Sequence, residues 1–260
     1  MKKVVLALVA VLLVSALLAG CGVNKDHSSS KGSSKDKFVV GLDDSFPPMG
    51  FRDENGEIVG FDIDLAKEVS KRTGLSVEFK PVDWDGILLS LNNKDIDLIW
   101  NGLTITEERK EKIGFSESYL KNRQIIVVSK NSNIKSKKDL NGKVVAVQMG
   151  SSSDEALNKE TDLVKGIKEI KKYSNNTEAL MDLKYQRVSA VVIDEVVARY
   201  YISKKPGDYK ILEDNFGEEE YGVGYRKNDT EFGAKIDKAL KQIKEDGTMN
   251  TIYKKWFGEK

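Results

Sequence analysis

The sequence predicts an α/β fold with two lobes and a cleft between them. Apolar runs typical of buried strands alternate with amphipathic helical segments, and this alternation indicates a sheet covered by helices. The pattern occurs twice, in successive units of about a hundred residues, which is a common domain size. A strand-like segment and two helical segments then follow at the C-terminal end, so the chain is expected to return to its first unit.

The elements of the first unit are bounded by clear local signals. Phe61–Thr73 has apolar residues on one helical face and Gly74 after its last turn, which is a common helix stop. The other expected elements are strands over 38–43, 77–81 and 96–100 and a short helix over 85–91. Ligands of such sheets bind beside the carboxyl ends of the strands, where Asp43, Trp84 and the segment 101–109 fall.

The second unit repeats the pattern. Its expected strands cover 125–129, 144–148 and 188–193. A helix is expected to open at 150–153, another is expected to be capped by Thr177 and run to Tyr185, and a third to span 195 to about 203. The segment 221–225 is expected to cross back, followed by helices over 229–245 and 248–257.

Composition excludes several classes of function. The chain has 42 Lys and Arg against 41 Asp and Glu, and a nearly neutral protein lacks the basic face that nucleic acid binding requires. The single cysteine, Cys21, and the single histidine, His27, both precede the α/β region. A Ser-His-Asp triad, a cysteine nucleophile and a zinc site are therefore not expected there, and no metal or other cofactor is predicted.

The N-terminal residues indicate export and membrane anchoring. Two lysines precede an apolar run over 4–18, which is short for a membrane span, and Leu18-Ala-Gly-Cys21 ends it. This ending resembles the bacterial lipoprotein signal, in which the cysteine is diacylated and becomes the new N-terminus; an ordinary secretory peptide is the alternative. We expect a signal peptide over 1–20, an acylated Cys21 and a polar, flexible tether over 21–37.

The segment Asn101–Arg109 has the residues that a small carboxylate would need. Thr106 is placed to cap a short helix whose first turn contains Arg109, and the planar arginine fork matches both oxygens of a carboxylate. Gly102 and Thr104 would present open backbone groups and a hydroxyl beside it. The simpler alternative is a surface arginine in the charged run 107–112.

Several further motifs, taken together and in order, carry a family resemblance. They are Gly56-Glu-Ile-Val-Gly-Phe-Asp-Ile-Asp-Leu-Ala66, the 101–109 segment, Phe115-Ser116 with Tyr119, Gln148-Met-Gly-Ser-Ser152, Asp194, and Asp246-Gly-Thr-Met-Asn-Thr-Ile-Tyr-Lys-Lys-Trp256. With them, residues 38–260 resemble the polar amino acid-binding proteins of ABC importers, family 3 of the extracellular solute-binding proteins.

The resemblance implies a periplasmic-binding-protein-like (Venus flytrap) architecture with a two-strand hinge. Lobe 1 would comprise 38–124 and 221–260, and lobe 2 would comprise 125–220. It also implies a monomer that passes its ligand to an ABC permease, anchored by lipid on the extracellular or periplasmic face of the membrane.

The resemblance also implies contacts for each part of an amino acid. Arg109, Thr104 and Ser152 would bind the α-carboxylate, and a carbonyl of Asn101 or Gly102 together with Asp194 would bind the α-ammonium. Ser152 and Asp194 could instead be ordinary helix caps.

Four residues would face the ligand side chain. Phe46 and Trp84 would be its aromatic walls, and Gln148 and Asp43 its polar contacts. A carboxylate at Asp43 disfavours an acidic ligand, whereas cystine, glutamine and the basic amino acids remain open. Trp100 fits a pocket or a core equally well.

Two other functions are compatible with this fold. Some cyclohexadienyl dehydratases share it and need a proton donor in the cleft. The expected carboxylate and ammonium contacts favour a receptor, so no enzymatic activity is predicted. A sensor domain is a third alternative, disfavoured because no kinase sequence precedes Lys260.

Overall fold

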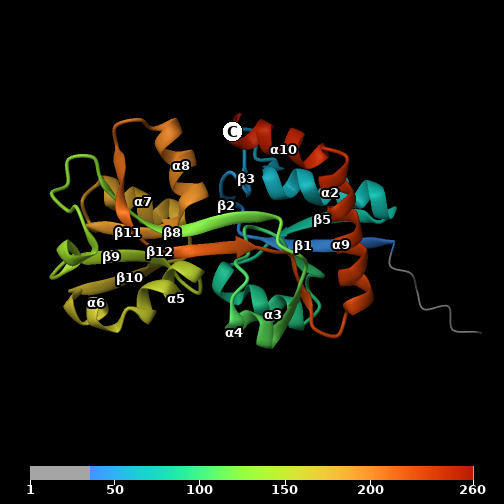
Figure 1. The fold of residues 1–260 in the computed structure, drawn as a ribbon, viewed down its shortest axis with the longest axis horizontal. Helices are drawn as coiled ribbons and strands as arrows, with labels where there is room; N and C mark the ends of the chain where they lie inside the picture. Colours follow the sequence, from blue (N-terminus) through green and yellow to red (C-terminus); the bar gives the residue numbers. More distant parts are fainter. Residues whose placement is uncertain (1–35, 260) are drawn as a thin grey trace, which may run out of the picture. The chain divides into compact units, whose positions relative to one another are not determined.

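Two five-stranded sheets form the framework of residues 36–259, the part of the chain that the computed structural model describes (Figure 1). The first sheet has the order β5-β1-β6-β13-β7. Its strands are β1 (Lys37–Leu42), β5 (Ser76–Pro81), β6 (Leu98–Ile99), β7 (Ile113–Phe115) and β13 (Gly224–Arg226). A small antiparallel sheet beside it comprises β2 (Ser45–Phe46), β3 (Gly50–Arg52) and β4 (Ile58–Val59).

The second sheet has the order β10-β9-β11-β8-β12. Its strands are β8 (Leu120–Ser129), β9 (Val144–Gln148), β10 (Glu169–Tyr173), β11 (Ala190–Asp194) and β12 (Tyr209–Tyr221). Strands β9, β10 and β11 are parallel, and β8 runs antiparallel to both of its neighbours.

Helices cover both sheets. In the first lobe they are α2 (Phe61–Thr73), the 3-10 turn η1 (Trp84–Gly86), α3 (Ile87–Asn92), α4 (Glu107–Lys112), α9 (Thr230–Glu245) and α10 (Thr248–Phe257). In the second lobe they are the 3-10 turn η2 (Lys137–Leu140), α5 (Ser152–Lys159), α6 (Thr161–Gly166), α7 (Asn176–Lys184) and α8 (Glu195–Lys204). Figure 1 shows α7 and α8 on one side of the second sheet and α5 and α6 on the other.

The two lobes are joined by two long strands. β8 and β12 pair antiparallel from Leu120 opposite Tyr221 to Ser129 opposite Tyr209, with irregular register between. In Figure 1 they run side by side from one lobe to the other. The predicted α/β fold with two lobes and a two-strand hinge is confirmed. The second crossing strand is β12, which ends at Tyr221. The predicted crossing segment, 221–225, was therefore placed too late in the sequence.

Buried apolar side chains follow the predicted pattern. The helix over 61–73 is confirmed with its limits, and Gly74 adopts the left-handed conformation at its end. Val40, Leu98 and Val191 are fully buried in the sheets. Trp100 is fully buried against Tyr119, with ring centroids 6.2 Å apart, so it belongs to the core and not to a pocket.

Several local predictions differ from the structure. Thr177 does not cap α7, because the side chain of Asn175 accepts the hydrogen bond from the Glu178 amide. The strand expected over 96–100 is paired only at Leu98–Ile99, and the helix over 85–91 is divided into η1 and α3. The amphipathic segment that forms β12 was missed because its alternation is interrupted at a register shift between Ile211 and Asn215.

The predicted signal peptide over 1–20 and the acylated Cys21 lie outside the described residues. So does the predicted tether up to residue 35, whereas Lys37 already belongs to β1. None of the described helices is both long and apolar enough to cross a membrane.

Candidate functional site

The ten predicted binding residues lie where the two lobes meet. Lobe 1 contributes Asp43 after β1, Phe46 on β2, Trp84 on η1, and the loop and helix that hold residues 101–109. Lobe 2 contributes Gln148 at the end of β9, Ser152 at the start of α5 and Asp194 at the end of β11. All are buried or nearly so. Side-chain hydrogen bonds join the lobes between Gln148 and Asp43 and between Thr104 and Ser152.

Arg109 is a buried cation without a carboxylate partner within ion-pair distance among the described residues. Its guanidinium donates to the carbonyl oxygens of Thr104, at 2.9 Å, and of Gly150 across the cleft, at 3.3 Å. It is 8% exposed, and burial lowers its pKa from the ordinary value. Thr106 caps α4, as predicted, by accepting from the Arg109 amide at 3.2 Å, and so fixes the first turn of the helix. A desolvated guanidinium in this position is suited to bind an anion.

Hydroxyl groups from both lobes lie at the same end of the site. The oxygens of Thr104 and Ser152 are 2.9 Å apart, and Gln124 Nε2 donates to Ser152 Oγ at 3.1 Å. Ser152 is not the cap of α5, because Ser151 accepts from the Asp154 amide instead. The Ser152 hydroxyl is therefore free of that role and faces lobe 1.

Asp194 faces the cleft and not its own helix. It occupies the N-cap position of α8 without a capping hydrogen bond from its side chain. Its Oδ1 accepts from Asn122 at 2.9 Å, from Gln124 at 2.8 Å and from the Tyr221 hydroxyl at 2.6 Å. Burial and the nearby Glu219 carboxylate raise the pKa of Asp194 to about 7.

Four polar residues of this region were not predicted as site residues: Asn122, Gln124, Glu219 and Tyr221. Glu219 Oε1 accepts from Thr104 at 2.9 Å, from Asn122 at 2.6 Å and from Gln124 at 2.8 Å. Strand periodicity could have found them, since alternate residues of a strand share a face. The missing information was the limits of β12 and its register with β8.

Polar groups form a second centre at the ends of β1 and β9. Gln148 Nε2 donates to Asp43 Oδ2 at 2.8 Å, and Asn176 donates to Gln148 Oε1 at 2.9 Å. The other oxygen of Asp43 accepts from the amide and the hydroxyl of Ser45. Burial raises the pKa of Asp43. This carboxylate can accept from the distal group of a ligand.

Phe46 and Trp84 present parallel faces. Their ring centroids are 6.5 Å apart and the angle between their planes is 1°. The Arg109 guanidinium lies 6.0 Å from the Trp84 ring, which therefore connects the aromatic pair to the carboxylate end. A flat group between the rings would make two contacts of about 3.5–4.0 Å each and needs about 7–8 Å between the ring planes, so the rings must move apart slightly to admit one.

A buried carboxylate supports the loop that follows β6. Asp62 Oδ2 accepts from the Gly102 amide at 2.7 Å and from the Tyr119 hydroxyl at 2.9 Å. Burial raises the pKa of Asp62 to about 7. Asn101 does not direct its side chain into the cleft: its Oδ1 accepts from the Asp43 amide at 3.2 Å and its Nδ2 has no hydrogen-bond partner. Backbone carbonyls of this loop are the groups left for a ligand.

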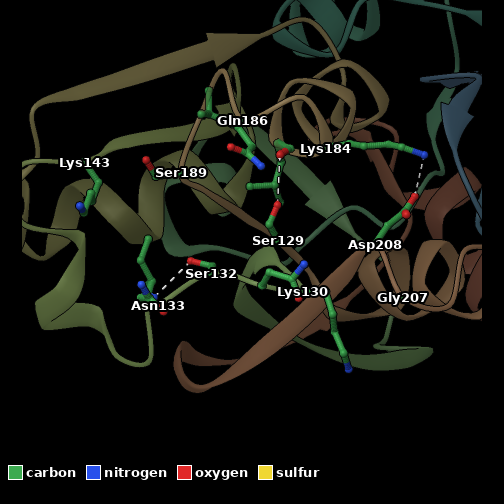
Figure 2. Close-up of a pocket in the computed structure, with 14 residues that line it drawn as sticks. Ser129, Lys130, Ser132, Asn133, Lys143, Lys184, Gln186, Ser189, Gly207 and Asp208 are labelled. Carbon is green, nitrogen blue, oxygen red and sulfur yellow. Dashed lines mark hydrogen bonds and ion pairs between the residues drawn. The ribbon is translucent and has the colours of Figure 1, made fainter.

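A separate hollow of about 620 Å³ lies at the other ends of the strands of lobe 2 (Figure 2). Its cations are the exposed Lys130, Lys143 and Lys184, and Lys184 pairs with Asp208 at 2.9 Å. None of the ten predicted residues lines it. The hollow lacks the buried groups of opposite charge that distinguish the cleft.

The chemistry of the cleft is that of a binding site. No group of three or more His, Cys, Asp or Glu side chains suited to a metal ion occurs within residues 36–259. The buried guanidinium lies at one position, and the carboxylates of Asp194 and Glu219 lie at another. A zwitterion has the complementary charges.

Comparisons with known proteins agree with this geometry. The model of the bacterial extracellular solute-binding proteins, family 3, matches residues 38–259. The chain is 35% identical to the arginine-binding extracellular protein ArtP of Bacillus subtilis, with 100% of both chains covered. It is 32% identical to the L-cystine-binding protein TcyJ of Escherichia coli, covering 97% of this chain and 95% of the relative. A solved structure of an ancestral arginine-binding protein bound to arginine is 48% identical, with a TM-score of 0.81, covering 86% of this chain and 99% of the other.

Proposed function

Because the chain belongs to family 3 of the bacterial extracellular solute-binding proteins, we propose that it is the receptor of an ABC importer for a cationic L-amino acid, with L-arginine as the preferred ligand. One observation carries the proposal. Buried Arg109 lies at one part of the cleft, and the carboxylates of Asp194 and Glu219 lie at another. These charges match the two ends of an amino acid backbone.

The α-carboxylate binds to Arg109, with the hydroxyls of Thr104 and Ser152 as further donors. Binding replaces the two carbonyl contacts of the guanidinium with a charged, bidentate partner, which is the stronger interaction. The α-ammonium binds to Asp194 and to a carbonyl of Asn101 or Gly102. Contacts from both lobes stabilise the closed form over the open one.

The side chain of the ligand extends between Phe46 and Trp84 toward Asp43. An arginine guanidinium is flat and always charged, so it can stack on the ring faces, which separate slightly to admit it, and donate to Asp43. Lysine has the charge without the flat group, glutamine lacks the charge, and the distal end of cystine carries an ammonium and a carboxylate with no net charge. The relatives named for arginine support arginine as the preferred ligand. The relative named for cystine makes cystine the main competitor to test.

A thermal-shift screen of the purified protein against the amino acids, ornithine and cystine tests the proposal. L-Arginine should produce the largest shift, because a ligand at 100 times its dissociation constant adds about 2.7 kcal/mol to the free energy of unfolding. A larger shift with cystine or glutamine would overturn the ligand identity, and no shift with any amino acid would overturn the function.

Asp43→Asn tests the side-chain contact directly. It should weaken arginine binding at least tenfold while changing glutamine binding less, because only arginine has a charge for Asp43 to balance. Asp44→Asn is the matched control, since Asp44 pairs with Arg52 and not with Gln148. Equal losses for both ligands would argue against the distal contact.

We also propose that Cys21 carries the lipid anchor after removal of residues 1–20, that the residues between Cys21 and β1 form a tether, and that the working protein is a monomer at the outer face of the cell membrane. Lobe 1 is taken as 38–124 with 221–260, and lobe 2 as 125–220. Mass spectrometry of the protein isolated from membranes should find acyl chains on Cys21. Cys21→Ser should move the protein to the soluble fraction, and an unchanged membrane fraction would exclude the anchor.

A further inference from the structure

We propose that Glu219 is a second carboxylate for the α-ammonium of the ligand, and that Glu219 and Asp194 together hold a proton which the amino acid displaces on binding. The inference rests on the proposed function, because it assigns a further residue and a pH response to the same site. We call Asp194 and Glu219 the carboxylate pair.

The sheet brings the pair together through register. Gln124 lies opposite Asp194 on the neighbouring strand β11, and Asn122 lies opposite Glu219 on β12. Since residues 122 and 124 are two apart, their side chains leave β8 on the same face. Three adjacent strands therefore direct the two carboxylates and two amides to one side of the sheet.

The two carboxylates share donors. Asn122 Nδ2 lies 2.9 Å from Asp194 Oδ1 and 2.6 Å from Glu219 Oε1. Gln124 Nε2 lies 2.8 Å from each of the same two oxygens. Two acceptors within hydrogen-bond distance of the same nitrogen atoms are close enough for their charges to repel strongly, so one of them is favoured to hold a proton.

Glu219 is also part of the binding surface. Its Oε1 accepts from the Thr104 hydroxyl, which has only one proton to donate. The Ser152 hydroxyl must then donate to Thr104, so a chain of hydrogen bonds runs from Ser152 through Thr104 to Glu219. The side chain of Glu219 thus contacts the same groups that we propose to bind the ligand backbone.

Few other charges face the pair. Arg109 on α4 is the cation whose charged form both carboxylates favour, and Tyr221 donates its hydroxyl to Asp194. Glu155 on α5 also acts on Arg109, and Arg123 is already paired with Glu195. Burial, and after it the proximity of Glu219, raise the pKa of Asp194 to about 7, in agreement with a proton held near neutral pH.

An ammonium group can replace this proton. It carries three N–H donors and one positive charge, so it can donate to both carboxylates at once. The displaced proton leaves to solvent and the ligand remains charged. Affinity should therefore fall as the pH falls through 7, because protons compete with the ligand below that pH.

The test uses L-arginine, whose side chain does not titrate, and measures its dissociation constant by calorimetry between pH 6 and pH 8 in buffers of different ionisation enthalpy. For the wild-type protein we expect a dissociation constant about ten times larger at pH 6 than at pH 8, with release of a proton on binding at pH 6. Glu219→Gln keeps an oxygen acceptor for Thr104 but removes the charge. It should bind at least tenfold more weakly than wild type at pH 8 and within about threefold of it at pH 6.

Glu220→Gln is the matched control, since Glu220 is exposed and adjacent on the same strand. It should retain the wild-type pH profile. A purely structural role of Glu219 predicts that Glu219→Gln loses the same affinity for arginine at both pH values. Either this result, or arginine binding that is independent of pH and releases no proton, would overturn the inference and leave the proposed function standing. Carboxyl NMR of the ligand-free protein provides a measurement that needs no ligand: the pKa of Asp194 should be lower in Glu219→Gln than in wild type, whereas the pKa of Asp62 should be the same in both. Failure of every amino acid to bind would instead overturn the proposed function, and with it the displacement step.

Discussion

Arg109 is a buried charge whose surroundings indicate a binding function. Removing a guanidinium from water is costly unless charged or polar partners replace the water. Its partners among the described residues are two carbonyl oxygens and the Trp84 ring, which satisfy its geometry without balancing its charge. The carboxylates of Glu155, Glu219 and Asp194 act on this charge from beyond ion-pair distance, and the ligand carboxylate is proposed as its direct partner.

Arg109→Ala should raise the dissociation constant for L-arginine at least tenfold, because truncating one partner of a buried charge pair costs about 2–5 kcal/mol. The dissociation constant of Arg109→Lys should lie between those of wild type and Arg109→Ala, since lysine keeps the charge and loses the planar fork. Calorimetry measures both. Lys110→Ala, an exposed neighbour on the same helix, is the control, and wild-type affinity in Arg109→Ala would remove this residue from the site.

Asp62 makes the stability of the ligand-free protein depend on pH. Its folded-state pKa is raised to about 7 by burial, so the stability that comes from its protonated form is complete at low pH and is lost as the pH rises through 7. Its contribution to the free energy of unfolding should fall by about 1 kcal/mol between pH 6 and pH 8. Urea unfolding should show that the free energy of unfolding decreases less between pH 6 and pH 8 for Asp62→Asn than for wild type. Asp95→Asn, at an exposed position, should show the same decrease as wild type. A decrease in Asp62→Asn equal to that of wild type would contradict the prediction.

At the scale of the elements, the loop between β6 and α4 requires a glycine. Gly102 has a φ of 61°, and a β-carbon there would lie 2.9 Å from Phe46 and 3.1 Å from Tyr221. A larger residue would disturb an aromatic wall and the hinge strand at once, so the loop, the wall and the hinge strand constrain one another.

Gly102→Ala should therefore lower the free energy of unfolding by more than Gly142→Ala, which is the matched control. Gly142 has a φ of 70° but open space around its α-carbon, so its substitution carries only the backbone cost of about 1–2 kcal/mol. Gly102→Ala adds the steric contacts and should also weaken arginine binding. Thermal and urea unfolding measure the loss of stability, and calorimetry measures the loss of arginine affinity. Equal losses of stability in the two variants would show that Phe46 and Tyr221 move away from the added methyl group at no cost.

Much of the fold was predictable because local signals agree with it. The helix over 61–73 has a clear apolar face and a glycine stop, and β9 is apolar up to its last residue, Gln148. β12 was missed because its burial alternates irregularly and its pairing with β8 depends on residues far away in sequence. Asp194 was predicted as a ligand contact through the family resemblance, whereas placing Glu219 beside it required the register of three strands. The individual contacts of the predicted binding residues remain predictions until a ligand is measured.

At the scale of the whole described region, contacts outside the binding residues also hold the lobes together. Phe51 on β3 packs against Tyr200 on α8, with ring centroids 5.6 Å apart. Thr177 on α7 donates to the Ser45 carbonyl at 3.2 Å. These contacts join the lobes through residues that are not themselves proposed to bind the ligand, although Ser45 also donates to Asp43.

Tyr200→Ala should weaken arginine binding by about two- to tenfold, since an aromatic pair is worth about 0.5–1.5 kcal/mol and this one favours closure. Tyr200→Phe keeps the ring and is the control. Small-angle scattering of the ligand-free variant should show a more open average than wild type. Unchanged affinity and scattering would mean that the ring contact does not contribute to closure.

The strand order of the first sheet also governs how the chain can fold as it is synthesised. β13 lies between β6 and β7, although it follows both of them by more than a hundred residues in sequence. The second sheet, by contrast, is built from one continuous stretch, Leu120 to Tyr221. The second sheet can therefore be complete while the first still lacks the strand that joins its two parts. The first sheet therefore cannot be completed before Gly224–Arg226 has been made, although most of its strands precede the second sheet in sequence.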